Sequence, residues 1–479
     1  MENIGKQEKL SDNTLMEFES INYVSSGTPI LNDRKNDNLA PMTKYLSTLS
    51  IRSINDMKPT SYLETLTHMI KANIGCGLLA TGMAFKNGGL LLSGILIFIL
   101  GIISTYNQYI LVLMATEMKT QYNYRIIGFA ETIGIAFESG SLLFKKSASF
   151  VKHSISIFVT LTQLGFCCVY LIFISQSLKQ ICNSYGLSLD DRILMVFIFP
   201  IIWATALIRE LKYIAPLSTA ANLSIFIALG LILYNNVQNL PSISERKLIG
   251  NWSQLSLCFG TVIYALEGIS LVLPLQQNMR KNKQFLGPFG VLNLSLSFVT
   301  LLIFTIGFFG YMKHGDEVRE SLTYNLEIKN NIITQLVIFC MVFGILCTYS
   351  LQFFVPVRIL LPTVKRWSSS WPYQKFHIYE YVLRSVLVFM TFLIAELIPH
   401  IDLFVSLIGA IGSTFLALIF SPLADLSRRK KDDFGLFKWR LIINLISILI
   451  GLCGFSIGTT ISLKEIYAAL CKDFKEKNL

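Results

Sequence analysis

Long apolar runs separated by short polar or charged stretches dominate the sequence. We count eleven such runs, at about residues 62–85, 89–115, 153–180, 193–208, 213–235, 254–276, 288–311, 332–361, 378–396, 401–421 and 440–462. Most approach or exceed the roughly 20 residues that a helix needs to cross a bilayer. They are too long for barrel strands of about 10 residues, and lipid tolerates only helices or closed barrels. The pattern therefore predicts an all-α polytopic membrane protein with eleven transmembrane helices.

The two ends of the chain have a different composition from this apolar body. Residues 1–58 carry eight acidic and seven basic side chains and no apolar stretch typical of a signal peptide. We interpret 1–58 as a disordered cytosolic N-terminal tail, because polar, charge-rich segments bury too little apolar surface to fold. Residues 59–465 are then the transmembrane domain, and 466–479 a short C-terminal tail.

Charge supports the membrane interpretation and predicts an orientation. Only 15% of the residues are charged, against about 25% in soluble domains. The net charge of +11 does not indicate nucleic-acid binding, because the bases are unevenly divided between alternate loops. One set of loops holds 19 Lys and Arg residues and the other holds 7. Since basic loops stay in the cytosol, the N-terminus is expected inside and the C-terminus outside.

Two surface motifs follow from that orientation. Arg428-Arg429-Lys430-Lys431 is the densest basic cluster, and we interpret it as a topology anchor rather than a lipid-headgroup site. Asn251-Trp252-Ser253 is a glycosylation sequon on the predicted outer side, close to the start of a span. Asn251 is therefore the predicted glycosylation site.

The sequence offers little chemistry for an enzyme. Most of the nine cysteines lie within apolar runs, where Cys behaves as a small hydrophobe. They have no metal-binding spacing. No His-Ser-Asp constellation, metal cluster or phosphate-binding loop is recognisable near a membrane face, so we expect neither enzymatic activity nor a cofactor.

Two of the eleven spans contain glycine at mid-membrane depth. The first span carries Gly75 and Gly77, and the sixth carries Glu267 beside Gly268. Glycine weakens a helix by up to about 1 kcal/mol relative to alanine, so both spans are expected to be interrupted. The two spans begin consecutive sets of five, at about 60–236 and 253–421. That arrangement is typical of transporters built from two inverted repeats, although the glycines could instead only allow close helix packing.

Broken helices at these positions would suit a small zwitterion. Amide groups near Gly77 and Leu78 would face a carboxylate where the first helix restarts. Carbonyl groups near Ile263 and Tyr264 would face an ammonium group where the sixth helix stops. Small residues leave room between them, and Tyr349 in span 8 adds a hydroxyl. The predicted substrate-binding residues are Gly75, Cys76, Gly77, Leu78, Tyr264, Ala265, Glu267, Gly268 and Tyr349.

Ionisable residues within spans are candidates for function, because burying them in a membrane is costly. His68 lies two turns before the first interruption and could respond to protons or serve as a structural histidine. Glu267 could carry a coupled proton or cap the free amides of a broken helix. Both alternatives stay open for each residue.

Several ordered blocks carry a family resemblance over about residues 60–465. They include His68–Leu79, Thr162–Tyr170, Phe259–Thr261, Glu267–Ile269, Val272–Leu275 and Leu351–Phe353. With these blocks, the chain resembles the proton-coupled amino acid transporters of the amino acid/auxin permease superfamily. The resemblance implies a five-plus-five inverted repeat of the leucine-transporter type, an eleventh helix, and symport of small neutral amino acids with protons. It also implies that His68 matches an essential histidine, so His68 joins Glu267 as a predicted proton-coupling residue.

The sequence departs from the family pattern in ways that keep other functions open. A second family histidine falls at Tyr106, a proline at Gly82 and an acidic residue at Gln276. Cys182 has no cysteine in residues 312–330 to form the family's disulfide, so no such bridge is expected. The alternatives are an amino acid sensor whose N-terminal tail binds signalling partners, or facilitated or sodium-coupled transport. The plasma membrane and the endolysosomal membrane are both compatible locations.

Overall fold

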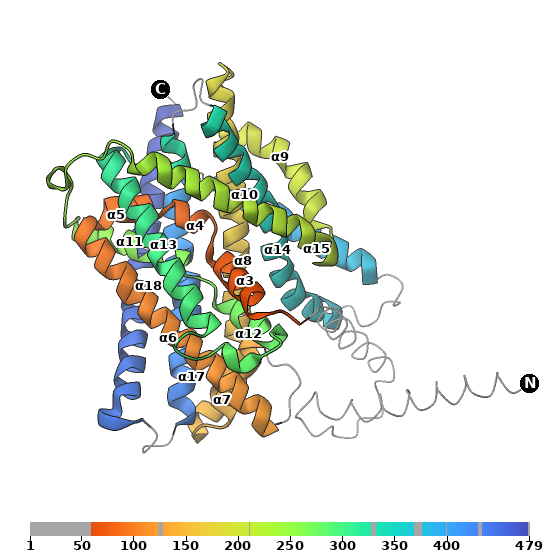
Figure 1. The fold of residues 1–479 in the computed structure, drawn as a ribbon. Helices are drawn as coiled ribbons and strands as arrows, with labels where there is room; N and C mark the ends of the chain where they lie inside the picture. Colours follow the sequence, from red (N-terminus) through yellow and green to blue (C-terminus); the bar gives the residue numbers. More distant parts are fainter. Residues whose placement is uncertain are drawn as a thin grey trace, which may run out of the picture.

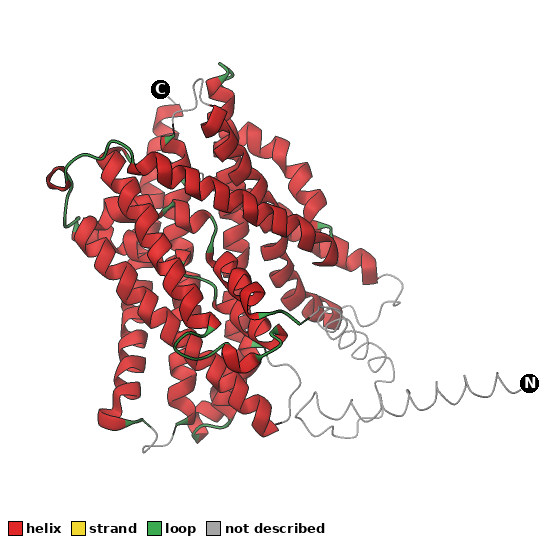
Figure 2. Ribbon diagram, in the orientation of Figure 1, coloured by secondary structure: helices red, strands yellow, loops and turns green. Residues whose placement is uncertain are grey.

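The computed structural model describes residues 59–122, 128–209, 211–326, 332–367, 376–398, 400–429 and 434–477. Within these ranges the chain is helical, with one isolated parallel bridge between Thr60 and Met279 as its only strand-like pairing (Figures 1 and 2). This confirms the predicted all-α class. The predicted tail 1–58, together with Lys430 and Lys431, lies outside the described residues.

The helices follow the predicted apolar runs closely. In chain order they are α3 (Tyr62–Asn73), α4 (Cys76–Leu79), α5 (Thr81–Gly88), α6 (Leu90–Tyr122), α7 (Phe129–Glu138), α8 (Leu142–Ser184), α9 (Asp191–Ala206), α10 (Leu211–Val237), α11 (Trp252–Ala265), α12 (Ile269–Asn278), α13 (Val291–His314), α14 (Ile332–Trp367), α15 (Phe376–Leu397), α16 (Ile401–Ile408), α17 (Ser421–Arg428) and α18 (Trp439–Lys477). Two π-helical segments, η6 (Gly409–Ser413) and η7 (Phe415–Phe420), lie between α16 and α17.

Nine helices in the described part of the chain are long and apolar enough to cross a membrane. One of them is the interrupted pair α11–α12, and another is the run from Ile401 to Arg428 that contains the π segments. The two remaining predicted spans are also helical. The first is divided into α3, α4 and α5, and the fourth is α9, which has 16 residues.

Three helical features extend beyond the predicted spans. α8 begins at Leu142, eleven residues before the predicted start, because Lys145, Lys146 and Lys152 lower the hydropathy of a stretch that is nevertheless helical. α7 is a separate amphipathic helix and packs against α8 and α17. α18 continues to Lys477, so residues 466–477 of the C-terminal tail prolong the last helix.

The two interrupted spans lie among the other helices of the described structure. α8, the longest helix, packs against α7, α9, α14, α15 and α16. α11 packs against α5, α16 and η6, while α13 covers α3 and α5. The interrupted segments are therefore enclosed by helices from several parts of the chain.

Candidate functional site

The first span is interrupted at the predicted glycines. α3 ends at Asn73, Ile74 and Gly75 are extended, and α4 starts at Cys76. Leu78 donates its amide to the Gly75 carbonyl at 3.2 Å, so the prediction of a free Leu78 amide was wrong. A tight turn forms as the helix restarts and uses that group. The Gly77 amide has no backbone acceptor among the described residues, which keeps it available for a ligand.

The sixth span is interrupted between α11 and α12. The Leu266 amide bonds to the Val262 carbonyl at 3.0 Å, and the Glu267 amide bonds to the Tyr264 carbonyl at 3.3 Å. The predicted free carbonyl of Tyr264 is thus used by the last turn of α11, which tightens as it ends. That same tightening leaves the Ile263 carbonyl without the amide that a continuing α-helix would direct to it.

The two interruptions touch each other. A Cβ atom added to Gly77 would lie 2.7 Å from Cδ1 of Tyr264 and 3.0 Å from Cα of Ala265. One added to Gly268 would lie 2.5 Å from Oδ1 of Asn73. Glycine is thus needed on both sides for close backbone approach. The predicted residues Gly75, Cys76, Gly77, Tyr264, Ala265, Glu267 and Gly268 all belong to this one region.

The far ends of the same spans are also joined. The Thr60 amide donates to the Asn278 carbonyl at 3.0 Å, and the Arg280 amide donates to the Thr60 carbonyl at 2.9 Å. Thr60, two residues before the start of α3, is therefore fixed to the end of α12. This backbone bridge aligns the two spans on one side of the interruptions.

Buried polar atoms without partners surround the contact. Glu267 is 5% exposed, and neither of its carboxyl oxygens has a hydrogen-bond partner. The Tyr264 hydroxyl and Oδ1 of Asn73 are also unpaired, although Nδ2 of Asn73 donates to the Met69 carbonyl at 2.9 Å. The Ser413 hydroxyl on η6 lies near Glu267 but outside hydrogen-bond geometry. An unpaired buried group costs about 1–3 kcal/mol, so the site is built to receive hydrogen bonds.

α8 supplies an aromatic wall that the site prediction from sequence did not include. The rings of Phe166 and Tyr264 meet edge to face, with their centroids 4.6 Å apart. The hydroxyl of Tyr170 would lie 3.4 Å from a Cβ added to Gly75. Gln163, one turn before Phe166, donates to the Ser270 hydroxyl of α12 at 3.3 Å. The Thr162–Tyr170 block held the signal for this wall, whereas nothing in the sequence linked Ser413 to Glu267.

Three other predicted residues are positioned by their own surroundings. The Tyr349 hydroxyl is 3.0 Å from the Thr391 hydroxyl of α15, so it is already paired. His68 is exposed on α3, with Glu64 and Lys71 as its charged neighbours. Asn251 is exposed immediately before the first residue of α11. None of the three forms a hydrogen bond with Glu267.

Residues 315–326 close one side of the site. The buried Leu322 lies against Gly82 and Gly310, where added Cβ atoms would meet its side chain. Tyr324 stacks on Phe173 with ring centroids 6.0 Å apart, and its hydroxyl donates to the Phe173 carbonyl at 3.3 Å. The Leu322 contact also explains why a small residue stands at position 82. This segment thus packs against α5, α8 and α13.

Comparisons with known proteins agree with this architecture. The model of the transmembrane amino acid transporter protein family matches residues 58–464. The chain is 34% identical over 412 residues to the proton-coupled amino acid transporter-like protein pathetic of Drosophila melanogaster, covering 86% of each chain. It is 24% identical over 425 residues to the probable amino acid transporter skat-1 of Caenorhabditis elegans, covering 87% of this chain and 91% of that one. The chain therefore belongs to the transmembrane amino acid transporter family.

Proposed function

We propose that the protein is a secondary active transporter that moves small neutral amino acids together with protons into the cytosol. The observation that carries the proposal is the direct contact between the two interrupted spans, with a buried and unpaired carboxyl group beside it. Interrupted helices that meet at mid-membrane depth are how such transporters expose backbone groups to a substrate. The family and the printed name of the Drosophila relative support the same conclusion.

The proposed substrate class is based on the polar atoms at the contact between the two interruptions and on the little room that its glycines leave. The unpaired Gly77 amide suits a carboxylate, and the Ile263 carbonyl suits an ammonium group. The unpaired hydroxyl of Tyr264 adds a third group that can bond to a substrate. Because the glycines already contact their neighbours closely, a small side chain fits this region best. Alanine, glycine and proline are the substrates we propose.

Coupling to protons rests on two residues with different surroundings. Glu267 is buried next to the substrate region without a partner, so neutralising its charge by protonation would relieve the cost of burial. His68 is exposed on α3, and an imidazole can take up and release a proton near neutral pH. We propose that Glu267 carries the coupled proton and that His68 exchanges it with the aqueous phase.

We also propose the complete architecture expected from the sequence. It has eleven membrane crossings, with α3–α5 counted as the first and α9 as the fourth, and two inverted repeats of five. The N-terminus is cytosolic, and the protein resides in the plasma membrane or the endolysosomal membrane. The basic bias of the loops supports this orientation.

Uptake by purified protein in proteoliposomes tests the function. Labelled alanine, glycine and proline are offered with and without an inward proton gradient, and with sodium replaced by choline. We expect the gradient to raise uptake and choline to leave it unchanged. Uptake that ignores the gradient but needs sodium would refute proton coupling. Direct binding without uptake would instead identify a sensor.

A further inference from the structure

Unpaired polar atoms continue from Glu267 along the run from Ile401 to Arg428. The hydroxyls of Ser413 and Ser421 are buried without a hydrogen-bond partner. One carboxyl oxygen of Asp425 is also buried without a hydrogen bond, and it lies 3.7 Å from Nε of Arg428 as an ion pair. Two steps of four residues take Ser413 to Ser421, and one more reaches Asp425. Each of these three side chains is 0% exposed. Polar atoms in this number are costly inside a membrane protein unless water satisfies them.

Neighbouring helices add polar atoms to the same line. Asn107 of α6 donates to the Ala417 carbonyl at 2.7 Å and to the Ser447 hydroxyl of α18 at 2.8 Å. Asn444 of α18 donates to Asp425 at 3.0 Å. The side-chain oxygens of Asn107 and Asn444 are themselves unpaired. Three elements thus contribute polar atoms to the interval between Ser413 and Asp425.

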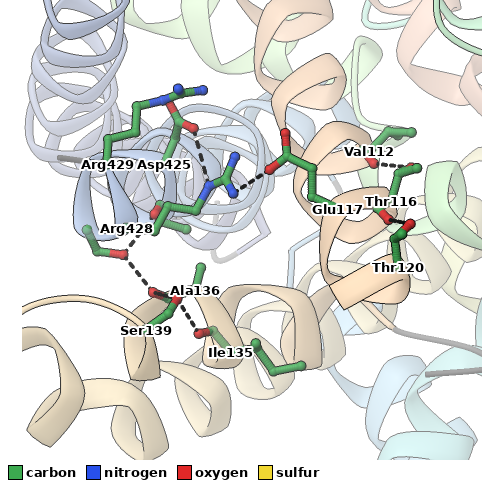
Figure 3. Close-up of polar contacts among 12 residues, drawn as sticks. Val112, Thr116, Glu117, Thr120, Ile135, Ala136, Ser139, Asp425, Arg428 and Arg429 are labelled. Atoms are coloured by element: carbon green, nitrogen blue, oxygen red, sulfur yellow. Dashed lines mark hydrogen bonds and ion pairs between the residues drawn. The ribbon is translucent and has the colours of Figure 1, made fainter. Parts of the chain in front are cut away.

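The line ends in a charged cluster, whose members Asp425, Arg428, Arg429 and Glu117 are drawn in Figure 3. Nε of Arg429 donates to Asp425 at 2.7 Å, and Arg428 pairs with Glu117 of α6. Tyr106 of α6 also lies near Asp425, and Arg440 of α18 is a further charged neighbour of Tyr106. The loop that follows Arg428 belongs to the basic set, so the cluster faces the cytosol in the proposed orientation. Arg428 and Arg429 are therefore ion-paired within the protein, beyond the anchoring role expected from their charge alone.

We propose that these side chains enclose a hydrated pathway that carries protons from Glu267 to the cytosolic cluster at Asp425. The pathway is lined by Ser413, Ser421, Asn107 and Asn444, and it is separate from the contact between the two interrupted spans. The inference rests on the proposed function, because it assigns a release route to the coupled proton. Water can bridge the successive unpaired oxygens, since ordered water inside proteins typically makes about three hydrogen bonds.

Two facts distinguish this pathway from a buried polar contact that only stabilises the packing of helices. Ser406 and Ser462 also form a buried polar contact between α16 and α18, but their hydroxyls pair with each other at 3.1 Å. Ser421, in contrast, has no partner to lose. A structural role therefore predicts that Ser421→Ala is neutral, because the lost hydroxyl leaves no partner without a hydrogen bond. The proposed role predicts a defect in proton movement.

The first test measures proton movement and amino acid exchange in the same proteoliposomes. We expect Ser421→Ala and Ser413→Ala to slow substrate-dependent acidification by about tenfold, about 1.4 kcal/mol. In Ser421→Ala, exchange of labelled for unlabelled amino acid, which needs no net proton release, is expected to stay near the wild-type rate. Ser406→Ala is the matched control and is expected to retain both activities. Normal acidification in both test variants would overturn the pathway.

The second test detects water without relying on transport. Ser421→Cys and Ser413→Cys are treated with a small, charged methanethiosulfonate reagent, and labelled peptides are quantified by mass spectrometry. We expect both to react about tenfold or more faster than Ser406→Cys and the native, fully buried Cys258, because only a hydrated thiol ionises. Reaction as slow as at Cys258 would overturn the pathway. A wild-type protein that exchanges amino acids without moving protons would refute the proposed coupling itself. The labelling test distinguishes that result from the absence of water in the pathway.

Discussion

The backbone of Gly268 lies directly against the amide side chain of Asn73, so that an added Cβ would come within 2.5 Å of the Asn73 oxygen. This contact joins the end of α3, which precedes the first interruption, to the start of α12, which follows the second. It fixes how close the two spans approach. Any substrate or proton that passes between them depends on this spacing.

Gly268→Ala is therefore expected to reduce amino acid uptake by about tenfold or more. A methyl group at this position overpacks the contact, at a cost of about 1–3 kcal/mol, and pushes α12 away from Asn73. Uptake per molecule is measured after quantifying protein in the membrane. Gly230→Ala is the control, because a Cβ there meets nothing within 4 Å. Equal uptake by the two variants would show that the contact does not govern transport.

Tyr264→Phe is expected to raise the KM for alanine several-fold without lowering thermal stability. The Tyr264 hydroxyl is buried without a partner, so its loss removes no bond from the empty protein. Tyr349→Phe is the matched control, because it breaks the 3.0 Å contact with Thr391 and should cost about 1 kcal/mol of stability. An unchanged KM in Tyr264→Phe would remove that hydroxyl from the substrate site.

His68→Ala is expected to lower proton-driven uptake by about tenfold while leaving the amount of protein in the membrane unchanged. The side chain is exposed on α3, so its removal disturbs little packing. Uptake as a function of external pH is the measurement. A variant that retained the full pH response would show that protons reach Glu267 without His68.

Asn251→Gln tests the predicted orientation. Asn251 is exposed just before α11, and glycosylation enzymes act only on the non-cytosolic side. The wild-type protein is expected to lose apparent mass on glycosidase treatment, and the variant to lack that change. Modification of Lys430 or Arg429 by a reagent that reaches only the outer face would contradict the orientation.

The pair formed by Lys247 and Asp316 provides a negative control for pH dependence. A 2.9 Å hydrogen bond to Asp316 raises the pKa of Lys247 above its ordinary value. Its contribution to stability is therefore complete below the ordinary lysine pKa of about 10.4 and is lost only as pH rises through the raised value. Lys247→Gln is expected to leave the ratio of uptake at about pH 5.5 and 7.5 unchanged. A flattened response in this variant would mean that the loop, rather than Glu267 or His68, senses pH.

The sequence located the spans and both interruptions because glycine and a buried acid at mid-membrane depth are strong local signals. It did not reveal which backbone groups stay free. Leu78 and Tyr264 use theirs in tight turns, a detail of turn geometry that composition does not encode. It also did not place Ser413 beside Glu267, since that proximity depends on how η6 packs against α11. Contacts between distant segments were thus the part of the site that only the structure supplied.

The bridge between Thr60 and Met279 also has a consequence outside the membrane. The chain enters the described structure at this bridge, which holds the start of α3 to the end of α12. If the two spans separate on that side during transport, the hydrogen bonds of Thr60 with Asn278 and Arg280 must break. A fluorophore pair at residues 59 and 283 would report this separation as a change in energy transfer during transport. In the proposed orientation, a cytosolic protein that bound the segment before Thr60 and opposed this separation would slow transport.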